Sequence, residues 1–201
     1  ENYRALTKGL DFDVYHVPGN HDVRWSPLGG QIFEEFVGKP YREFEFDGVH
    51  FLLLDSTVPL SHWGHYEKPM LDWLKGRLEE IGKEAPVIIG THHWTGRDRI
   101  MIDNESIFHE IIRPYNVKLI LTGHGHSDLL WNYDQQLLTM NKGLYQGSWQ
   151  MVEVDLEEGF LRLSRRSEES KKLVELAKVP LEPKKAGDLR VTLPTSVSAG
   201  S

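Results

Sequence analysis

Three short segments of the chain carry side chains that commonly bind metal ions. Gly19-Asn20-His21-Asp22, Gly90-Thr91-His92-His93 and Gly123-His124-Gly125-His126 each follow an apolar, strand-like run, at residues 14–17, 87–89 and 117–121. Ligands of open α/β sheets bind outside the carboxyl ends of the strands. Imidazole nitrogens and an amide oxygen suit Zn, Fe and Mn. The pattern therefore predicts that the three segments meet at one sheet edge and bind a transition metal.

Each segment also has a less specific interpretation. His124 and His126 are two residues apart, so in an extended segment both side chains point the same way, and the flanking glycines leave room for an ion or a phosphate. The alternative is a solvated loop. Asn20 offers a neutral oxygen donor, but Gly-Asn is also common in ordinary turns. The occurrence of three such segments in order favours metal binding.

Together these segments resemble the motifs of the calcineurin-like metallophosphoesterases. Gly19-Asn20-His21-Asp22 matches the G-N-H-D/E motif, and Gly123-His124-Gly125-His126 matches the G-H-x-H motif. The intervening His92-His93-Trp94 is similar to the family's H-x-P motif, with Trp94 at the proline position. The similarity covers roughly residues 1 to 165.

The resemblance implies an α/β fold in which helices flank a two-sheet β-sandwich. It implies hydrolysis of a phosphate ester by a hydroxide that two divalent or trivalent transition metal ions (Mn, Fe or Zn) activate. Asn20, His92 and His124 would bind one ion and His126 the other, with His92 preferred over its neighbour as the ligand. Aromatic residues near the motifs slightly favour a phosphodiester over a monoester.

The resemblance gives His21 a catalytic role. In the family, the matching histidine contacts the phosphate and protonates the leaving oxygen. Histidine exchanges protons near neutral pH, as a general acid requires. For Asp22, a role in positioning this loop and a purely structural role both remain open.

Two further motifs of the family, D-x-H and G-D-x-x-D/E, have no counterpart in this chain. The N-terminal βαβ unit that carries them is therefore expected to be absent, with residues 1–4 as the helix that follows the second motif. A missing N-terminal segment, from the same protein or another chain, would complete the metal site. We therefore expect this chain alone to bind metal poorly and to be inactive. The alternative function is a catalytically inactive phosphoesterase-like scaffold that binds a protein partner, but the intact motif residues favour an enzyme.

Composition narrows the class of protein. Hydrophobic content of 39% and charged content of 26% are typical of a globular domain. The chain has no cysteine, which excludes thiolate ligands and disulfides, and its formal charge of −7 disfavours a nonspecific nucleic-acid binder. No apolar run reaches the ~18 residues of a membrane span. The cellular compartment stays open.

The elements that must position these motifs alternate between strand and helix, as a layered α/β fold requires. Helices are expected at residues 31–37, 69–81 and after Asn104, and a hairpin at residues 42–54 around Asp47-Gly48. Antiparallel strands at 137–140, 149–154 and 160–164 are expected to form the second sheet. The phosphoesterase domain is assigned to residues 1–166. Residues 167–201 are assigned to an extension or linker, with a charged helix at 167–178, an alternating stretch at 188–193 and a linker-like end at 195–201.

Overall fold

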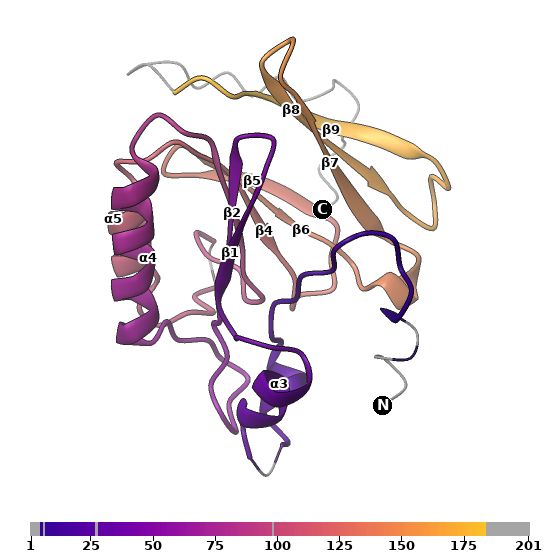
Figure 1. The fold of residues 1–201 in the computed structure, drawn as a ribbon. Coiled ribbons are helices and arrows are strands. Elements are labelled where there is room, and N and C mark those ends of the chain that lie inside the picture. Colours follow the sequence, from indigo (N-terminus) through magenta and orange to yellow (C-terminus); the bar gives the residue numbers. More distant parts are fainter. Residues whose placement is uncertain (1–4, 6, 27, 98, 184–201) are drawn as a thin grey trace.

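A computed structural model describes residues 5, 7–26, 28–97 and 99–183 (Figure 1). Its centre is a mixed sheet in the order β1-β2-β3-β4-β6-β5. The strands are β1 Arg42–Phe46, β2 Val49–Leu53, β3 Val87–Gly90, β4 Val117–Thr122, β5 Leu129–Tyr133 and β6 Gln136–Met140. Strands β2, β3, β4 and β6 run parallel, and the edge strands β1 and β5 pair antiparallel. The carboxyl ends of the four parallel strands therefore lie along one edge.

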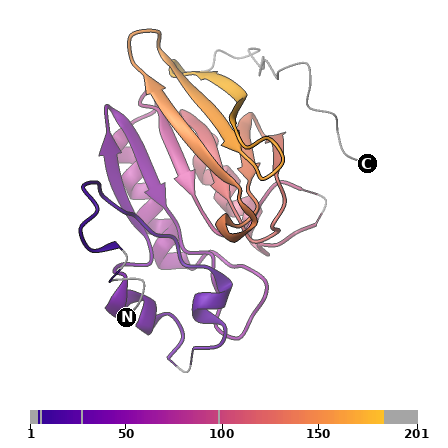
Figure 2. The same cartoon turned by 90° about the vertical axis from the view of Figure 1, so that its right-hand side faces the viewer.

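A second, antiparallel sheet in the order β7-β8-β9 packs on one face of the first. Its strands are β7 Trp149–Asp155, β8 Phe160–Arg166 and β9 Leu173–Pro180. The helices are α2 Asn20–Val23, α3 Gln31–Phe36, α4 Lys68–Ile81 and α5 Glu105–Ile112, with a 3-10 helix η1 at Leu144–Gln146. Figures 1 and 2 show α4 and α5 on the opposite face of the central sheet. The predicted two-sheet α/β architecture is confirmed.

Alternation along the parallel strands builds two cores. In β3, Ile88 packs toward the second sheet and Ile89 toward the helices, because successive side chains of a strand point to opposite faces. The helical core receives Met70, Leu71, Leu74 and Leu78 from α4. Both cores leave the carboxyl edge of the sheet to loops. None of the helices in the described ranges is long and apolar enough to cross a membrane.

The structure corrects the prediction for residues 14–17, which pair with no strand among the described residues. The segment is extended, and the Tyr15 ring stacks on Phe44 with centroids 3.8 Å apart. A Cβ built on Gly90 would lie 3.6 Å from Val17, so the segment still runs beside the end of β3. Side-chain contacts, rather than a hydrogen-bonded ladder, place it there.

Two assignments near the second sheet were also wrong. Residues 137–140 belong to β6, which pairs with β4 in the central sheet. Residues 167–178 do not form a helix, because β9 begins at Leu173 and pairs with β8. The Glu, Lys, Leu and Ala content favours a helix, but burial of Leu176, Ala177 and Val179 against the first sheet overrides that local preference.

The assignment of residues 167–201 to an extension or linker stays a prediction. The expected helix at residues 1–4 and the stretches at 188–193 and 195–201 lie outside the described residues.

Candidate metal centre

Three loops bring the predicted ligands together at the carboxyl edge of the sheet. His92 follows β3 and His124 follows β4, and these strands are neighbours. The backbone pairing continues past the strands, since the Gly123 amide donates to the His92 carbonyl at 2.9 Å. Asn20 opens the single-turn helix α2 and is buried. The sheet register thus places two imidazoles next to each other, and Asn20 Oδ1 contacts both.

Three polar atoms of these side chains form a small triangle. Asn20 Oδ1 lies 2.9 Å from His92 Nε2 and 3.2 Å from His124 Nδ1, and the two ring nitrogens are 3.1 Å apart. Hydrogen bonds cannot satisfy all three edges, because the oxygen carries no hydrogen. If both nitrogens are protonated, both donate to the Asn20 oxygen, and the 3.1 Å edge between the two nitrogens carries no hydrogen bond. If only one is protonated, the other directs a lone pair at the oxygen.

A cation at this triangle would satisfy all three lone pairs at once. Two donor atoms that each lie ~2.1 Å from one ion, at a right angle, are separated by about 3.0 Å. The observed edges of 2.9, 3.1 and 3.2 Å agree with that separation. The donor set of one amide oxygen and two imidazoles suits Zn, Fe or Mn. The residues present therefore fit a transition metal ion.

Both imidazoles are held in the neutral form that a metal ligand requires. Burial lowers the pKa of His92 to about 3, and the neighbouring His93 and His124 contribute further. Burial also lowers the pKa of His124 to about 3, with added effects of His93 and His62. Neutral imidazole offers a lone pair without having to release a proton first.

The G-N-H-D loop is shaped to present Asn20 at this point. The Asp22 carboxylate accepts a hydrogen bond from the Gly19 amide at 2.9 Å, which closes the first turn of α2. A Cβ on Gly19 would lie 3.1 Å from the His92 ring, so glycine allows the two loops to approach. The Asn20 Nδ2 atom is buried and has no hydrogen-bond partner among the described residues. It is thus a donor available to a bound group.

His124 and His126 both adopt left-handed backbone conformations, with φ of 65° and 48°. This corrects the expectation of an extended segment whose two histidines point the same way. The His124 ring meets Asn20 and His92, whereas His126 Nδ1 is hydrogen-bonded to the Tyr145 hydroxyl at 2.7 Å. Such conformations cost roughly 1–3 kcal/mol each in residues other than glycine and concentrate at functional sites. The turn therefore directs the two rings to different partners.

The sequence around this site matches a known family. Residues 1–128 match the calcineurin-like phosphoesterase family, a stretch that contains Asn20, His92, His124 and His126. The chain belongs to the calcineurin-like phosphoesterases. The resemblance of the three motifs to this family is therefore confirmed.

Several curated relatives of this phosphoesterase are named for one activity. The chain is 28% identical over 136 residues to the 3',5'-cyclic-nucleotide phosphodiesterase alr5338 of Nostoc sp., covering 64% of this chain and 50% of the relative. It is 29% identical to a probable cyclic nucleotide phosphodiesterase of Rhodococcus erythropolis, over 58% of this chain and 41% of that one. A third, from Coxiella burnetii and also named a probable cyclic nucleotide phosphodiesterase, is 29% identical over 67% of this chain and 56% of its own. The chain thus spans about half the length of these relatives.

Other histidines of this phosphoesterase surround the triangle. His93 is the third member of a group of possible ligands whose donor atoms lie within 4.8 Å of one another. Its Nδ1 is hydrogen-bonded to Ser56 Oγ at 2.9 Å and its Nε2 to the His62 carbonyl at 3.1 Å. Both ring nitrogens of His93 are thus hydrogen-bonded within the protein, whereas His92 Nε2 faces Asn20 and His124. The choice of His92 as the ligand stays a prediction.

The predicted catalytic residue, His21, is exposed on α2 next to Asn20. Its ring packs edge-on against Trp25, with centroids 4.5 Å apart. It is near enough to the centre for its charge to contribute to the lowered pKa of His92. The side chain is therefore beside the triangle but not part of it, as a group that contacts substrate should be.

Two further neighbours of the site histidines, Tyr145 and His62, belong to none of the three sequence motifs. Tyr145 lies on η1, with no motif near it, and 77% of its surface is exposed. His62 Nε2 lies 3.2 Å from His124 Nε2. The only sequence signal for His62 was its place in the loop before α4. Its neighbours could be found only once the fold was known.

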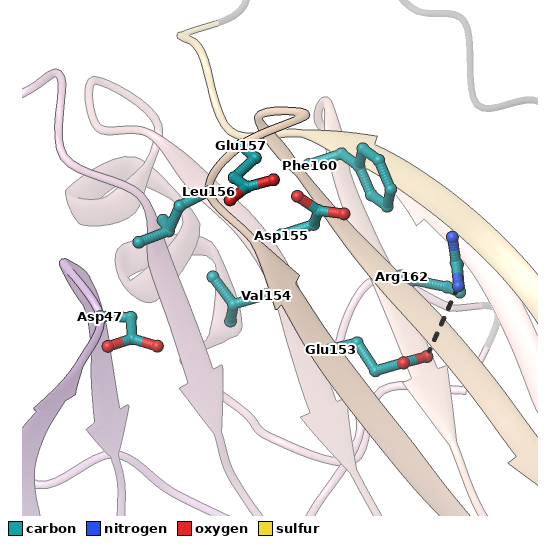
Figure 3. A pocket seen from close by; sticks show the side chains of 8 residues that line it. All are labelled: Asp47, Glu153, Val154, Asp155, Leu156, Glu157, Phe160 and Arg162. Carbon is teal, nitrogen blue, oxygen red and sulfur yellow. Dashed lines mark ion pairs between the residues drawn. The ribbon is translucent and has the colours of Figure 1, made fainter.

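A hollow at the opposite end of the sandwich has a different character (Figure 3). It lies between the β1–β2 turn at Asp47 and the β7–β8 turn, and acidic side chains at 47, 153, 155 and 157 line it. Glu153 pairs with Arg162 at 4.0 Å. Because it lies at the amino end of the parallel strands, it is not part of the metal centre.

Proposed function

We propose that the protein containing this chain is a metal-dependent phosphodiesterase that hydrolyses cyclic nucleotides. The triangle of Asn20, His92 and His124 supports the metal-dependent part, because its three polar atoms converge at the spacing expected of ligands to one ion. The names of the three relatives support the substrate class.

The roles of the side chains follow from their places. Asn20, His92 and His124 would hold one ion, and His126, turned away on the same loop, would hold a second. When bound, the two ions supply Lewis acidity toward the phosphoryl oxygens and lower the pKa of the attacking water. His21 donates its proton to the ester oxygen as the P–O bond breaks. The exposed position of His21 leaves it accessible to a substrate bound over the triangle.

The second ion needs donors beyond His126. Among the described residues, the group of convergent histidines and carboxylates is His92, His93 and His124, and His126 does not belong to it. We therefore propose that a segment outside this chain supplies the remaining ligands and that this chain alone has little activity. Metal analysis of the chain with and without the segment that supplies these ligands would show an increase of about one ion if this is correct.

Activity should depend on metal in a reversible way. The protein loaded with Mn²⁺ is expected to hydrolyse cyclic AMP, cyclic GMP and bis(4-nitrophenyl) phosphate. A chelator should abolish all three activities, and added Mn²⁺ should restore them. Phosphate-ester product is measured by chromatography. If the protein holds two ions per domain and still hydrolyses none of these diesters, it acts as a binding scaffold instead.

The Tyr145→Phe variant tests whether the hydroxyl orients His126. A metal-binding histidine usually donates its second N–H to an outer partner, and loss of that partner weakens the site about 10–100-fold. We expect the Mn²⁺ concentration for half-maximal activity to rise by about that factor. Saturating Mn²⁺ should restore the rate, which a folding defect would not allow.

The matched control is Tyr15→Phe. Tyr15 stacks on Phe44 and is not hydrogen-bonded to a predicted ligand. Loss of the Tyr15 hydroxyl should leave the Mn²⁺ concentration for half-maximal activity unchanged. If Tyr145→Phe also leaves it unchanged, the Tyr145 hydroxyl does not support metal binding.

A further inference from the structure

A cavity of about 360 Å³ opens beside the metal centre. Gly125, which lies between the predicted ligands His124 and His126, forms part of its wall, together with Trp94 and Met140. The Trp94 ring also lies close to the His124 ring, with centroids 5.5 Å apart. A substrate whose phosphate is bound at the triangle would therefore direct one of its substituents into this cavity.

One wall of the cavity is a flat aromatic surface whose orientation is fixed. The Trp94 indole N–H donates to the Arg99 backbone carbonyl at 3.0 Å. On the other side, a Cβ on Gly125 would lie 2.9 Å from the Trp94 ring and 2.6 Å from the Met140 sulfur. Glycine at this position lets the ligand loop pack directly against both side chains. An indole held in this way offers its face to a planar ring.

The charged side chains that line the cavity are Arg97 and Arg99, and no carboxylate is among the described residues that line it. The Arg97 guanidinium also rests on the Trp131 ring, 5.3 Å from its centroid. Arginine carries five N–H donors and no acceptor. The hydroxyl of Ser127, another lining residue, already donates to the Gly125 carbonyl at 3.0 Å. The cavity therefore combines a ring platform with an excess of donors.

We propose that this cavity binds the base of the substrate and favours guanine over adenine. The inference rests on the proposed function. Guanine presents two adjacent acceptors, O6 and N7, to which arginine binds in a bidentate manner, whereas adenine pairs its N7 acceptor with an N6 amino donor. At this edge Arg97 and Arg99 donate to both acceptors of guanine, whereas the same edge of adenine would place its N6 amino donor against the arginine donors. Trp94 stacks on either base and so contributes affinity rather than selectivity.

Binding of the hydrolysis products tests the inference without relying on catalysis. Titration calorimetry of the Mn²⁺-loaded protein should show GMP binding about tenfold more tightly than AMP. The Arg97→Met/Arg99→Met variant keeps unbranched, flexible side chains but removes the donors. This variant should bring the dissociation constants of GMP and AMP within about twofold of each other, mainly because it binds GMP more weakly. Trp94→Leu should lower the affinity for GMP and for AMP by a similar factor.

The control is Arg113→Gln, which removes one positive charge at a residue that does not line the cavity and pairs with Asp134. It should leave the GMP to AMP ratio unchanged. Equal affinity for both nucleotides in the unaltered protein, or a ratio that survives the double variant, would overturn the base-binding role. Hydrolysis of bis(4-nitrophenyl) phosphate distinguishes the two failures, because it reports the metal centre without a base. If the protein hydrolyses this diester but shows no base preference, only the base-binding role of the cavity is refuted. If the metal-loaded protein does not hydrolyse it, the proposed function is refuted.

Discussion

Alanine at His124 and alanine at His126 are expected to remove different metal ions from the completed domain. His124 lies in the triangle with Asn20 and His92, so His124→Ala leaves two ligands to that ion. His126 contacts Tyr145 instead, and it is predicted to bind the second ion, so His126→Ala should affect that ion. Each change should lower diester hydrolysis by more than about 100-fold, since even the outer partners of metal ligands contribute 10–100-fold. Metal analysis should show a loss of about one ion per domain in each variant.

Anomalous scattering from crystals of the two variants would locate the ion that remains. Thermal unfolding should change little, because both residues are in a loop at the end of β4 and outside the two cores. His65→Ala is the control, since His65 pairs with Asp103 at the surface at 2.6 Å. If both variants keep two occupied ions, or lose the same one, the ligand assignment is wrong.

The sequence was most informative where the chemistry is local. His92 and His124 each follow a short apolar run, and such runs in an alternating chain form parallel strands that end at one edge. Their convergence with Asn20 could therefore be expected without a structure. The hairpin at Asp47-Gly48 was equally predictable, because both residues adopt the positive φ that this turn requires.

Prediction failed where tertiary pairing decided the outcome. Strand β5 was missed because its turn to β6, Asp134-Gln135, adopts positive φ at both residues without any glycine to mark it. In β9, a register shift opposite Leu163/Ser164 breaks the alternation that marks a strand, so the segment resembled a charged helix. Both errors come from contacts between strands that have no local signal.

The residues that contact the site histidines could not be predicted from the sequence either. Tyr145 is 19 residues from His126 and His62 is 62 residues from His124, and each pair meets only through the fold. Likewise, the expectation that His124 and His126 point the same way assumed an extended backbone. The left-handed conformation of both residues reverses that geometry. Residue types alone do not reveal this turn, which directs the two rings to different partners.

The His21→Ala variant should distinguish proton donation from metal binding by its dependence on the leaving group. A ribose alkoxide is a strong base and needs a proton as it departs, whereas 4-nitrophenolate is stable as an anion. A positioned general acid contributes about 10²–10⁴-fold. Hydrolysis of cyclic nucleotides should therefore fall by at least about 100-fold, while hydrolysis of bis(4-nitrophenyl) phosphate should fall by less than about tenfold.

The His126→Ala variant is the matched contrast, because loss of a metal ligand should lower both reactions to a similar extent. Metal content should remain at two ions in His21→Ala, since His21 lies beside the triangle and donates no atom to it. Added imidazole should restore part of the cyclic nucleotide activity by supplying the missing acid. If His21→Ala slows both substrates equally and also loses metal, His21 supports the metal site and is not the proton donor. A selective loss with both ions retained would identify it as the group that protonates the leaving oxygen.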